Sequence, residues 1–396
     1  YFVNTTSGEI DVTLPAGTAG AVVAIKDYAG TFDTNKVTLV RNGSDKIGGV
    51  AINATLTTEG IAVTLVFVDS TQGWLVTDSG LQSEAPSPTF IAATGGTITT
   101  SGNFKIHTFT GPGTFTVCSV GNAQGSNTVD YLVVAGGGSG GGANGGGGGG
   151  GAGGFRLANT TCMPAPLTSP LASSTAVPVT ATGFPITVGG GGAGRTGSGR
   201  GTPGSNSIFS TITSTSGGGG GGNGSNGSGL PGGSGGGEGG QSATGGAGSG
   251  NTPSVSPPQG NSGGDTNPGI ETNQGSGGGG AGAAGSGNGP STQAGPGGNG
   301  SFVVQTGFAG CNGTPGPVGS TRYFAGGGGG NSENGSAPLQ GQGGAGGGGT
   351  GGQTGSDGGN APDNTGGGGG GIDSSPTGFT SGAGGSGIVI IRYKFQ

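Results

Sequence analysis

Seven consecutive glycines, Gly145–Gly151, followed by Ala152 and two more glycines, decide which folds are open to this chain. The run belongs to a wider bias, because 103 of the 113 glycines lie after residue 80, in clumps without a fixed period. Glycine has no Cβ, buries no side chain and loses the most backbone entropy on ordering. A segment of this composition either stays disordered or folds without an apolar core.

Charged and apolar side chains are both scarce outside the first 85 residues. Thirteen charged side chains lie in residues 1–85 and 15 in the 311 residues after them, and hydrophobic residues make up 28% of the chain. Disordered chains usually combine low hydrophobicity with high net charge, whereas the net charge here is only −6. Basic residues are not clustered, so the sequence lacks the basic patch that nucleic-acid binding needs. No apolar run approaches the ~20 residues of a membrane span.

The three cysteines, Cys118, Cys162 and Cys311, are far apart and match no metal-ligand or disulfide spacing. We expect three small buried thiols, with one bridge as the alternative. The chain begins at Tyr1 without a charged segment followed by an apolar one. This start indicates a fragment or a processed product rather than a secreted precursor.

The sequence predicts β-strands before and after the glycine-rich stretch, and these strands divide the chain into regions. The predicted order is a β module at 1–80, a linker at 81–89, a β region at 90–135, a glycine-rich insertion at 136–386 and a closing strand at 387–396. In the first module, short alternating runs separated by Gly, Asn, Asp and Pro predict strands, with Phe67 and Trp74 anchoring a modest core. We expect the closing strand to pair with the second β region, because a free linker would not need a strand at each end.

The glycine clumps exclude two repeat folds and leave three alternatives. Collagen requires glycine at every third position, which Gly145–Gly151 and Gly217–Gly222 violate, and a calcium-binding β-roll requires repeated Asp. Flexible Gly-Ser linkers and silk-like low complexity fit the composition. The ordered alternative is an array of threefold, polyproline-II-type glycine helices whose N–H groups bond to carbonyls on neighbouring helices. We predict this fold, with an all-β N-terminal module and essentially no α-helix.

Four segments resemble, in this order, the glycine-rich domain of bacteriophage tail fibres and adhesins. They are Tyr131-Leu132-Val133-Val134-Ala135-Gly136-Gly137-Gly138, Gly153-Gly154-Phe155-Arg156, Ile186-Thr187-Val188-Gly189-Gly190 and the closing residues 384–393. A fifth segment, which precedes them, is similar to small β modules of phage fibre and virion appendage proteins: Gly73-Trp74-Leu75-Val76. The resemblance implies a sandwich of glycine helices whose loops contact the host surface. It also implies a homotrimer, located outside the cell as part of the virion.

The sequence offers no catalytic constellation and no cofactor site. Matches to Gly-x-Gly-x-x-Gly lack the following helix that a nucleotide site requires. The single histidine, His107, lies on an alternating strand, where a structural role is expected. Carboxylate pairs of a depolymerase are conceivable from Asp357 with Asp363, or Asp265 with Glu271, although solvated loop charge is the simpler interpretation. We therefore expect no enzyme, no cofactor and no metal.

Aromatic and arginine residues that interrupt the glycine are the candidates for receptor binding, because such side chains are efficient interface anchors. They are Arg195, Arg200, Arg322, Tyr323, Phe324 and Phe379. An alternative for Tyr323 and Phe324 is burial at the end of the glycine sandwich. The polar stretches 252–272 and 331–342 are expected to be display loops.

The sequence therefore predicts a virion fibre whose glycine-rich domain binds an outer-membrane protein or glycan on a bacterium. Its partners would be this receptor and other tail or fibre proteins, with no nucleic acid and no membrane insertion. A structural fibre or extracellular filament without a receptor is the first alternative. A polysaccharide depolymerase is the second.

Overall fold

A computed structural model describes residues 1–81, 88–122, 125–159, 169–240, 245–266, 273–289, 293–333, 340–375 and 377–396. The described residues are nearly all β or extended, with two short helical turns, η2 (Gly224–Asn226) and η3 (Gln305–Ala309). The fold class predicted from the sequence is confirmed. The chain forms two compact units, Tyr1–Ser87 and Pro88–Gln396. Residues 82–87 of the predicted linker lie outside the described residues.

The first unit is a small sandwich of two sheets. Its strands are β1 (Phe2–Val3), β2 (Ile10–Thr13), β3 (Val22–Asp27), β4 (Val37–Val40), β5 (Ala54–Leu56), β6 (Ile61–Phe67) and β7 (Trp74–Leu81). The four-stranded sheet has the order β1-β3-β6-β7, and the three-stranded sheet the order β2-β4-β5. Phe67 and Trp74 both belong to the buried core between them, with ring centroids 5.5 Å apart, as predicted.

The second unit begins with two larger sheets that pack face to face. Its strands are β8 (Ala92–Thr94), β9 (Thr97–Ser101), β10 (Phe104–Phe109), β11 (Gly113–Ser119), β12 (Thr128–Val134), β13 (Gly142–Ala143), β14 (Phe155–Ala158), β15 (Ala172–Ser173), β16 (Val177–Pro178), β17 (Gly183–Thr187), β18 (Ser207–Phe209), β19 (Ile212–Ser214), β20 (Ser301–Val304), β21 (Thr314–Pro315), β22 (Thr321–Phe324), β23 (Ile372–Asp373) and β24 (Ile388–Lys394). One sheet has the order β15-β14-β12-β24-β10-β9, with β16 also paired to β12, and the other the order β19-β18-β17-β11-β8.

The central strands β12 and β24 pair antiparallel with each other and are buried on both faces. Alternate side chains enter opposite cores: Tyr131 and Val133 pack towards the five-stranded sheet, whereas Leu132 and Val134 pack towards β20 and β22. Because side chains alternate along a strand, a strand buried on both faces needs a continuous apolar run. This requirement explains both Tyr131–Val134 and the four aliphatic residues at the start of β24.

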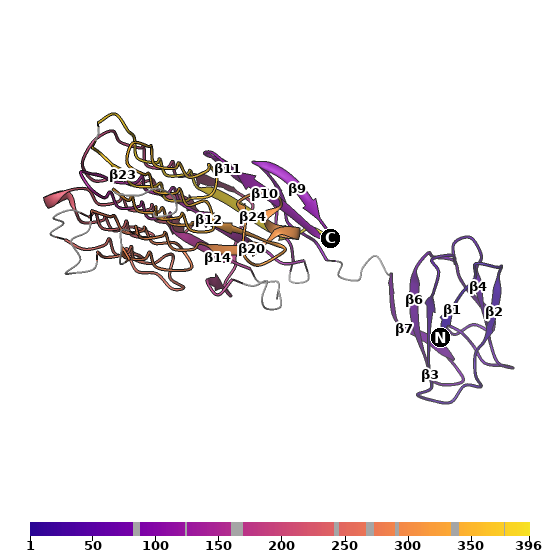
Figure 1. Ribbon diagram of the computed structural model, residues 1–396. Helices are drawn as coiled ribbons and strands as arrows, with labels where there is room; N and C mark the ends of the chain where they lie inside the picture. The colour runs from indigo at the N-terminus through magenta and orange to yellow at the C-terminus, as the bar shows by residue number, and fades with distance from the viewer. Residues whose placement is uncertain are drawn as a thin grey trace. The chain divides into compact units, whose positions relative to one another are not determined.

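Glycine segments continue directly from these strands and pack as a lattice of extended rods (Figure 1). Residues 145–154, which precede β14, form a central rod. Every third N–H of this rod donates to one neighbouring segment: Gly148 to Gly221, Gly151 to Gly218, and Gly154 to Thr215. The intervening N–H groups donate to segments 276–279 and 366–372, and carbonyls of the rod accept from segments 135–141, 234–240 and 328–331. The bonds to each neighbouring segment thus recur every three residues, and the rod bonds to neighbours all around its axis. This repeat is that of a threefold, polyproline-II-type helix.

The rods approach too closely for any side chain in the middle of the lattice. A Cβ placed on any of Gly147–Gly151 would lie only 2.1–2.3 Å from a carbonyl oxygen of a neighbouring segment. None of these five glycines has a positive φ, so the requirement for glycine is one of space rather than of backbone conformation. The lattice is therefore stabilised by backbone hydrogen bonds between rods, where a conventional domain would bury side chains.

His107 lies inside the core between the two larger sheets. Its Nδ1 is 2.7 Å from the carbonyl oxygen of Gly95 and its Nε2 is 3.2 Å from the hydroxyl of Tyr393. The imidazole also stacks on the Tyr393 ring and meets the edge of Phe115. These contacts make His107 a structural residue of the core. Burial lowers the pKa of His107, which the Gly95 bond only partly opposes, and the nearby charge of Lys105 lowers it further.

Acidification should destabilise this core through His107. The unfolded chain binds a proton near pH 6.5, whereas the folded chain binds it only at lower pH. The free energy of unfolding should therefore fall below pH 6.5, by up to ~1.4 kcal/mol per pH unit, until the folded pKa is reached. Since the chain has one histidine, urea denaturation between pH 7 and 5.5 isolates this group. A stability independent of pH over this range, or the same slope in His107→Gln, would contradict the expectation.

The expectation of three buried thiols is wrong for two of the cysteines. Cys118 and Cys311 are both unbridged and exposed. Cys118 follows the inward-facing Val117 on β11, so the alternation of the strand directs its side chain outward. Cys311 lies in the exposed segment after η3. Cys162 lies outside the described residues.

Candidate functional site

The turns between rods gather at the end of the lattice that lies away from β9 and β10, near β23 (Figure 1). We call this end the tip and define it by the described residues of the turns 143–146, 195–200, 223–228, 353–357, 373–375 and 377–380, the last two of which belong to one turn. Hydrogen bonds connect them: Ser374 N–H donates to the Ala143 carbonyl, and Thr196 forms a β-bridge with Thr380. The rods thus bring together five segments that are far apart in the sequence.

Both candidate arginines of the tip fasten turns by binding carbonyl oxygens. Arg195 donates to the carbonyl oxygens of Arg200 and Ser198, each at 2.9 Å, and so closes its own turn. Arg200 donates to Ser228 at 3.0 Å and to Ser225 at 3.2 Å, which joins this turn to the next one. A planar guanidinium with five N–H donors suits such multiple contacts. These two side chains hold the tip together, and they are half-buried rather than free.

Two further side chains, Asp357 and Phe379, connect the turns 353–357 and 373–380 of the tip. The Asp357 carboxylate accepts the N–H of Thr380 at 2.7 Å and so joins turn 353–357 to turn 373–380. Phe379 is half-buried, and its ring borders the turn at Gly355. Apart from the Asp357 carboxylate, the exposed side chains of the described tip are small and polar: Asn144, Thr196, Ser198, Ser225, Asn226, Thr354, Ser375 and Thr377. The sequence analysis did not select these residues, because such side chains are abundant throughout the chain.

Three of the six candidates do not lie at the tip. Arg322, Tyr323 and Phe324 form β22, which pairs with β20 at the strand end of the lattice. Tyr323 and Phe324 are buried, and the Phe324 ring packs into the core beside β12 and β24. Their selection as exposed contacts is therefore wrong, and the alternative of burial at the end of the sandwich is confirmed. Arg322 donates to the carbonyl oxygens of Cys311 and Asn312, which fastens the loop after η3.

The two expected display loops are only partly described. In the first, the segment up to Gln259 lies at the strand end of the lattice, because Gln259 accepts the N–H of Phe155 at 2.8 Å through its carbonyl oxygen. Its side chain also accepts the N–H of Thr215 at 2.9 Å. This part of 252–272 is therefore not a tip loop. Residues 267–272 and 334–339 lie outside the described residues.

The carboxylates considered for catalysis bind neighbouring backbone or hydroxyl groups. Asp265 accepts the N–H of Ala247 at 2.5 Å, and Asp363 accepts the hydroxyl of Ser386 at 3.3 Å, while Glu271 is not described. Among the described residues, no group of three His, Cys, Asp or Glu side chains is placed to hold a metal ion. In the same part of the chain, no helix has the length and apolarity to cross a membrane.

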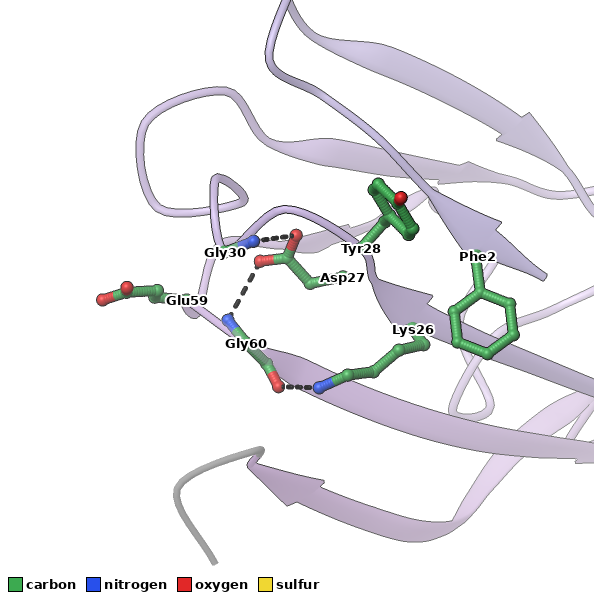
Figure 2. A pocket seen from close by; sticks show the side chains of 7 residues that line it. All are labelled: Phe2, Lys26, Asp27, Tyr28, Gly30, Glu59 and Gly60. Atoms are coloured by element: carbon green, nitrogen blue, oxygen red, sulfur yellow. Dashed lines mark hydrogen bonds between the residues drawn. The ribbon is translucent and has the colours of Figure 1, made fainter. Parts of the chain in front are cut away.

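The first unit has a pocket of about 480 Å³ on its four-stranded sheet (Figure 2). Asp27 lies at its base, with one carboxylate oxygen accepting the N–H of Gly30 at 3.0 Å and the other that of Gly60 at 2.9 Å. Thr31 and Phe32 donate two further N–H groups. Burial by itself raises the pKa of Asp27, but the four backbone N–H bonds together hold it below its usual value. The anchored carboxylate fixes the two turns that border the pocket.

Comparison with known proteins assigns the second unit to a family. The glycine-rich domain family matches residues 108–394, which include the end of β10, the strands β11–β24 and the whole lattice. No curated protein matches the chain. The matched range begins in β10 and ends with β24, the strands that frame the lattice. The chain therefore belongs to the glycine-rich domain family.

Proposed function

We propose that this protein is a non-enzymatic external fibre of a bacteriophage virion, whose glycine lattice binds a bacterial surface receptor through its tip. The observation that carries the proposal is the construction of the tip. Five described turns from distant parts of the chain meet on one surface, and their arginines bind carbonyl oxygens of the turns themselves. Small polar side chains remain exposed between them.

This construction separates recognition from folding. The lattice depends on backbone hydrogen bonds between glycine rods, and the exposed side chains of the turns take no part in those bonds. The small exposed side chains of the tip can therefore change with little loss of stability, which suits a surface that must follow a changing receptor. The resemblance of the glycine-rich unit to tail fibres supports the same proposal. The receptor would be an outer-membrane protein or a surface glycan.

Substitution at the tip tests this proposal. We expect the double variant Thr196→Ala/Phe379→Ala to bind host cells at least ~10-fold more weakly than the parent, since aromatic anchors dominate interface energies. The measurement is binding of the labelled full chain to a panel of bacterial strains by flow cytometry. Thr182→Ala is the matched control, because Thr182 is exposed near β17 at the strand end of the lattice.

Three results would contradict the proposal. Equal cell binding by the parent and the tip variant, with unchanged melting temperature, would remove the tip from recognition. Absence of binding to every strain would favour a structural fibre, and release of reducing ends from surface polysaccharide would favour a depolymerase.

A further inference from the structure

We propose that the pocket on the first unit binds a neutral saccharide, independently of the tip. Its lining residues are Phe2, Lys26, Asp27, Tyr28, Gly30, Glu59 and Gly60. The volume of about 480 Å³ falls within the range of ~300–1,000 Å³ for small-molecule sites. The pocket lies in the first unit, whereas the tip belongs to the second.

The strand register places two aromatic rings and one lysine on the outer face of the sheet. Phe2 of β1 is paired with Lys26 of β3, and Tyr28 follows two positions after Lys26, on the same face. Phe2 is 78% exposed and Tyr28 is 68% exposed. Figure 2 shows both rings beside Lys26, with Glu59 at the opposite end of the pocket. Grouped aromatic rings with this exposure are typical of a binding surface rather than of a solvated sheet face.

The polar groups of the pocket are held in place before any ligand arrives. The Lys26 ammonium donates to the Gly60 carbonyl oxygen, and the Gly60 N–H donates to Asp27. An ammonium has three N–H donors, and Gly60 takes one of them. The same carboxylate also binds the N–H groups of the turn after Tyr28. A preformed site of this kind loses little entropy when a ligand binds.

These groups match the chemistry of a pyranose ring. The face of an aromatic ring carries partial negative charge, and the C–H groups on one face of a sugar present partial positive charge to it. Sugar hydroxyls can accept from the Lys26 ammonium and donate to the Glu59 carboxylate. Lys26 and Glu59 carry opposite charges, and the carboxylate of the buried Asp27 already accepts four backbone N–H groups. The pocket therefore offers no unopposed charge to an ionic ligand, and a neutral saccharide fits best.

Titration of the full chain with lactose, cellobiose and methyl β-D-glucoside tests the proposal. Ligand-observed saturation-transfer NMR should detect at least one of them, with a dissociation constant on the order of 1 mM. Tyr28→Ala and Phe2→Ala should each weaken binding at least tenfold, whereas Tyr28→Phe should retain it, because the ring face persists. Ile52→Ala is the control, since Ile52 is 65% exposed but does not line the pocket.

Three outcomes would overturn the proposal. The first is no transfer to any of the three saccharides, and the second is equal binding by Tyr28→Ala and the parent. The third is self-association through this face, seen in sedimentation as an oligomer that Tyr28→Ala dissociates while no saccharide binds. None of these results bears on cell binding by the tip, which is measured with the tip variants.

Discussion

Gly149→Ala should lower the free energy of unfolding of the glycine-rich unit by about 3 kcal/mol, the upper end of the ~1–3 kcal/mol that overpacking of a rigid interior typically costs. The new Cβ would lie 2.1 Å from the carbonyl oxygen of Gly328. This obstacle is backbone, which cannot rotate away as a side chain can. Gly149 also donates to Ser276 and accepts from Gly237, so a shift of its rod disturbs both neighbours.

Gly190→Ala is the matched control for this prediction. Gly190 is exposed at the start of a rod, has no atom within 4 Å of a Cβ placed on it, and has no positive φ. Alanine there should be neutral or stabilising by about 0.4–1 kcal/mol, through the smaller entropy of the unfolded chain. Scanning calorimetry measures both variants, and the transition of residues 1–87 serves as an internal reference. Equal melting of Gly149→Ala and Gly190→Ala would contradict a close-packed lattice.

Asp130→Asn should cost about 3–5 kcal/mol, the usual effect of leaving a buried charge without its partner. Asp130 and Arg392 face each other across β12 and β24, are 5% and 3% exposed, and have Nη2 and Oδ2 2.5 Å apart. The guanidinium lies between the rings of Phe104 and Phe308, at 4.5 and 4.7 Å from their centroids. It also donates to the carbonyl oxygen of Gly307 and to Asn159. This one arginine therefore joins β10, β12, β24 and η3.

The exposed pair Lys36–Glu9 provides the comparison. Its side chains are 44% and 60% exposed and 3.5 Å apart, so Lys36→Met should change stability by less than ~1 kcal/mol. Urea denaturation of the full chain at pH 7 measures both variants. The double variant Asp130→Leu/Arg392→Met should recover part of the loss, because it leaves no buried charge. A cost for Asp130→Asn as small as that for Lys36→Met would contradict the assigned role of the pair.

Several features of the fold could be predicted from local composition. The lattice follows from glycine clumps without charge, and the doubly buried strands follow from the apolar runs that begin at Tyr131 and Ile388. Phe67 and Trp74 were predicted as core residues because they are the large apolar side chains of a small module. Burial of Cys118 was predicted from residue type alone, and it failed because strand alternation directs its side chain outward.

The candidate site was less predictable, because a residue belongs to it through its place in the folded lattice and not through its residue type. Arg195, Arg200 and Arg322 look alike in the sequence, yet two lie at the tip and one at the strand end. Which end a residue occupies depends on how many rods precede it and on where each rod turns. Thr196 and Thr380 meet at the tip although 183 residues separate them in the chain.

The sequence by itself determined which kinds of structural element form: strands where apolar residues alternate or run together, and rods where the residues are glycines without side chains. Composition suffices for this because a rod needs only the absence of Cβ atoms and of charge. The tertiary structure decided which rods are neighbours, which turns share the tip, and which rare side chains are buried. Glycine segments are almost identical to one another, so no local sequence feature specifies which segments lie side by side. The order is fixed instead by the strands to which the rods are joined, through non-local contacts such as that of Asp130 with Arg392.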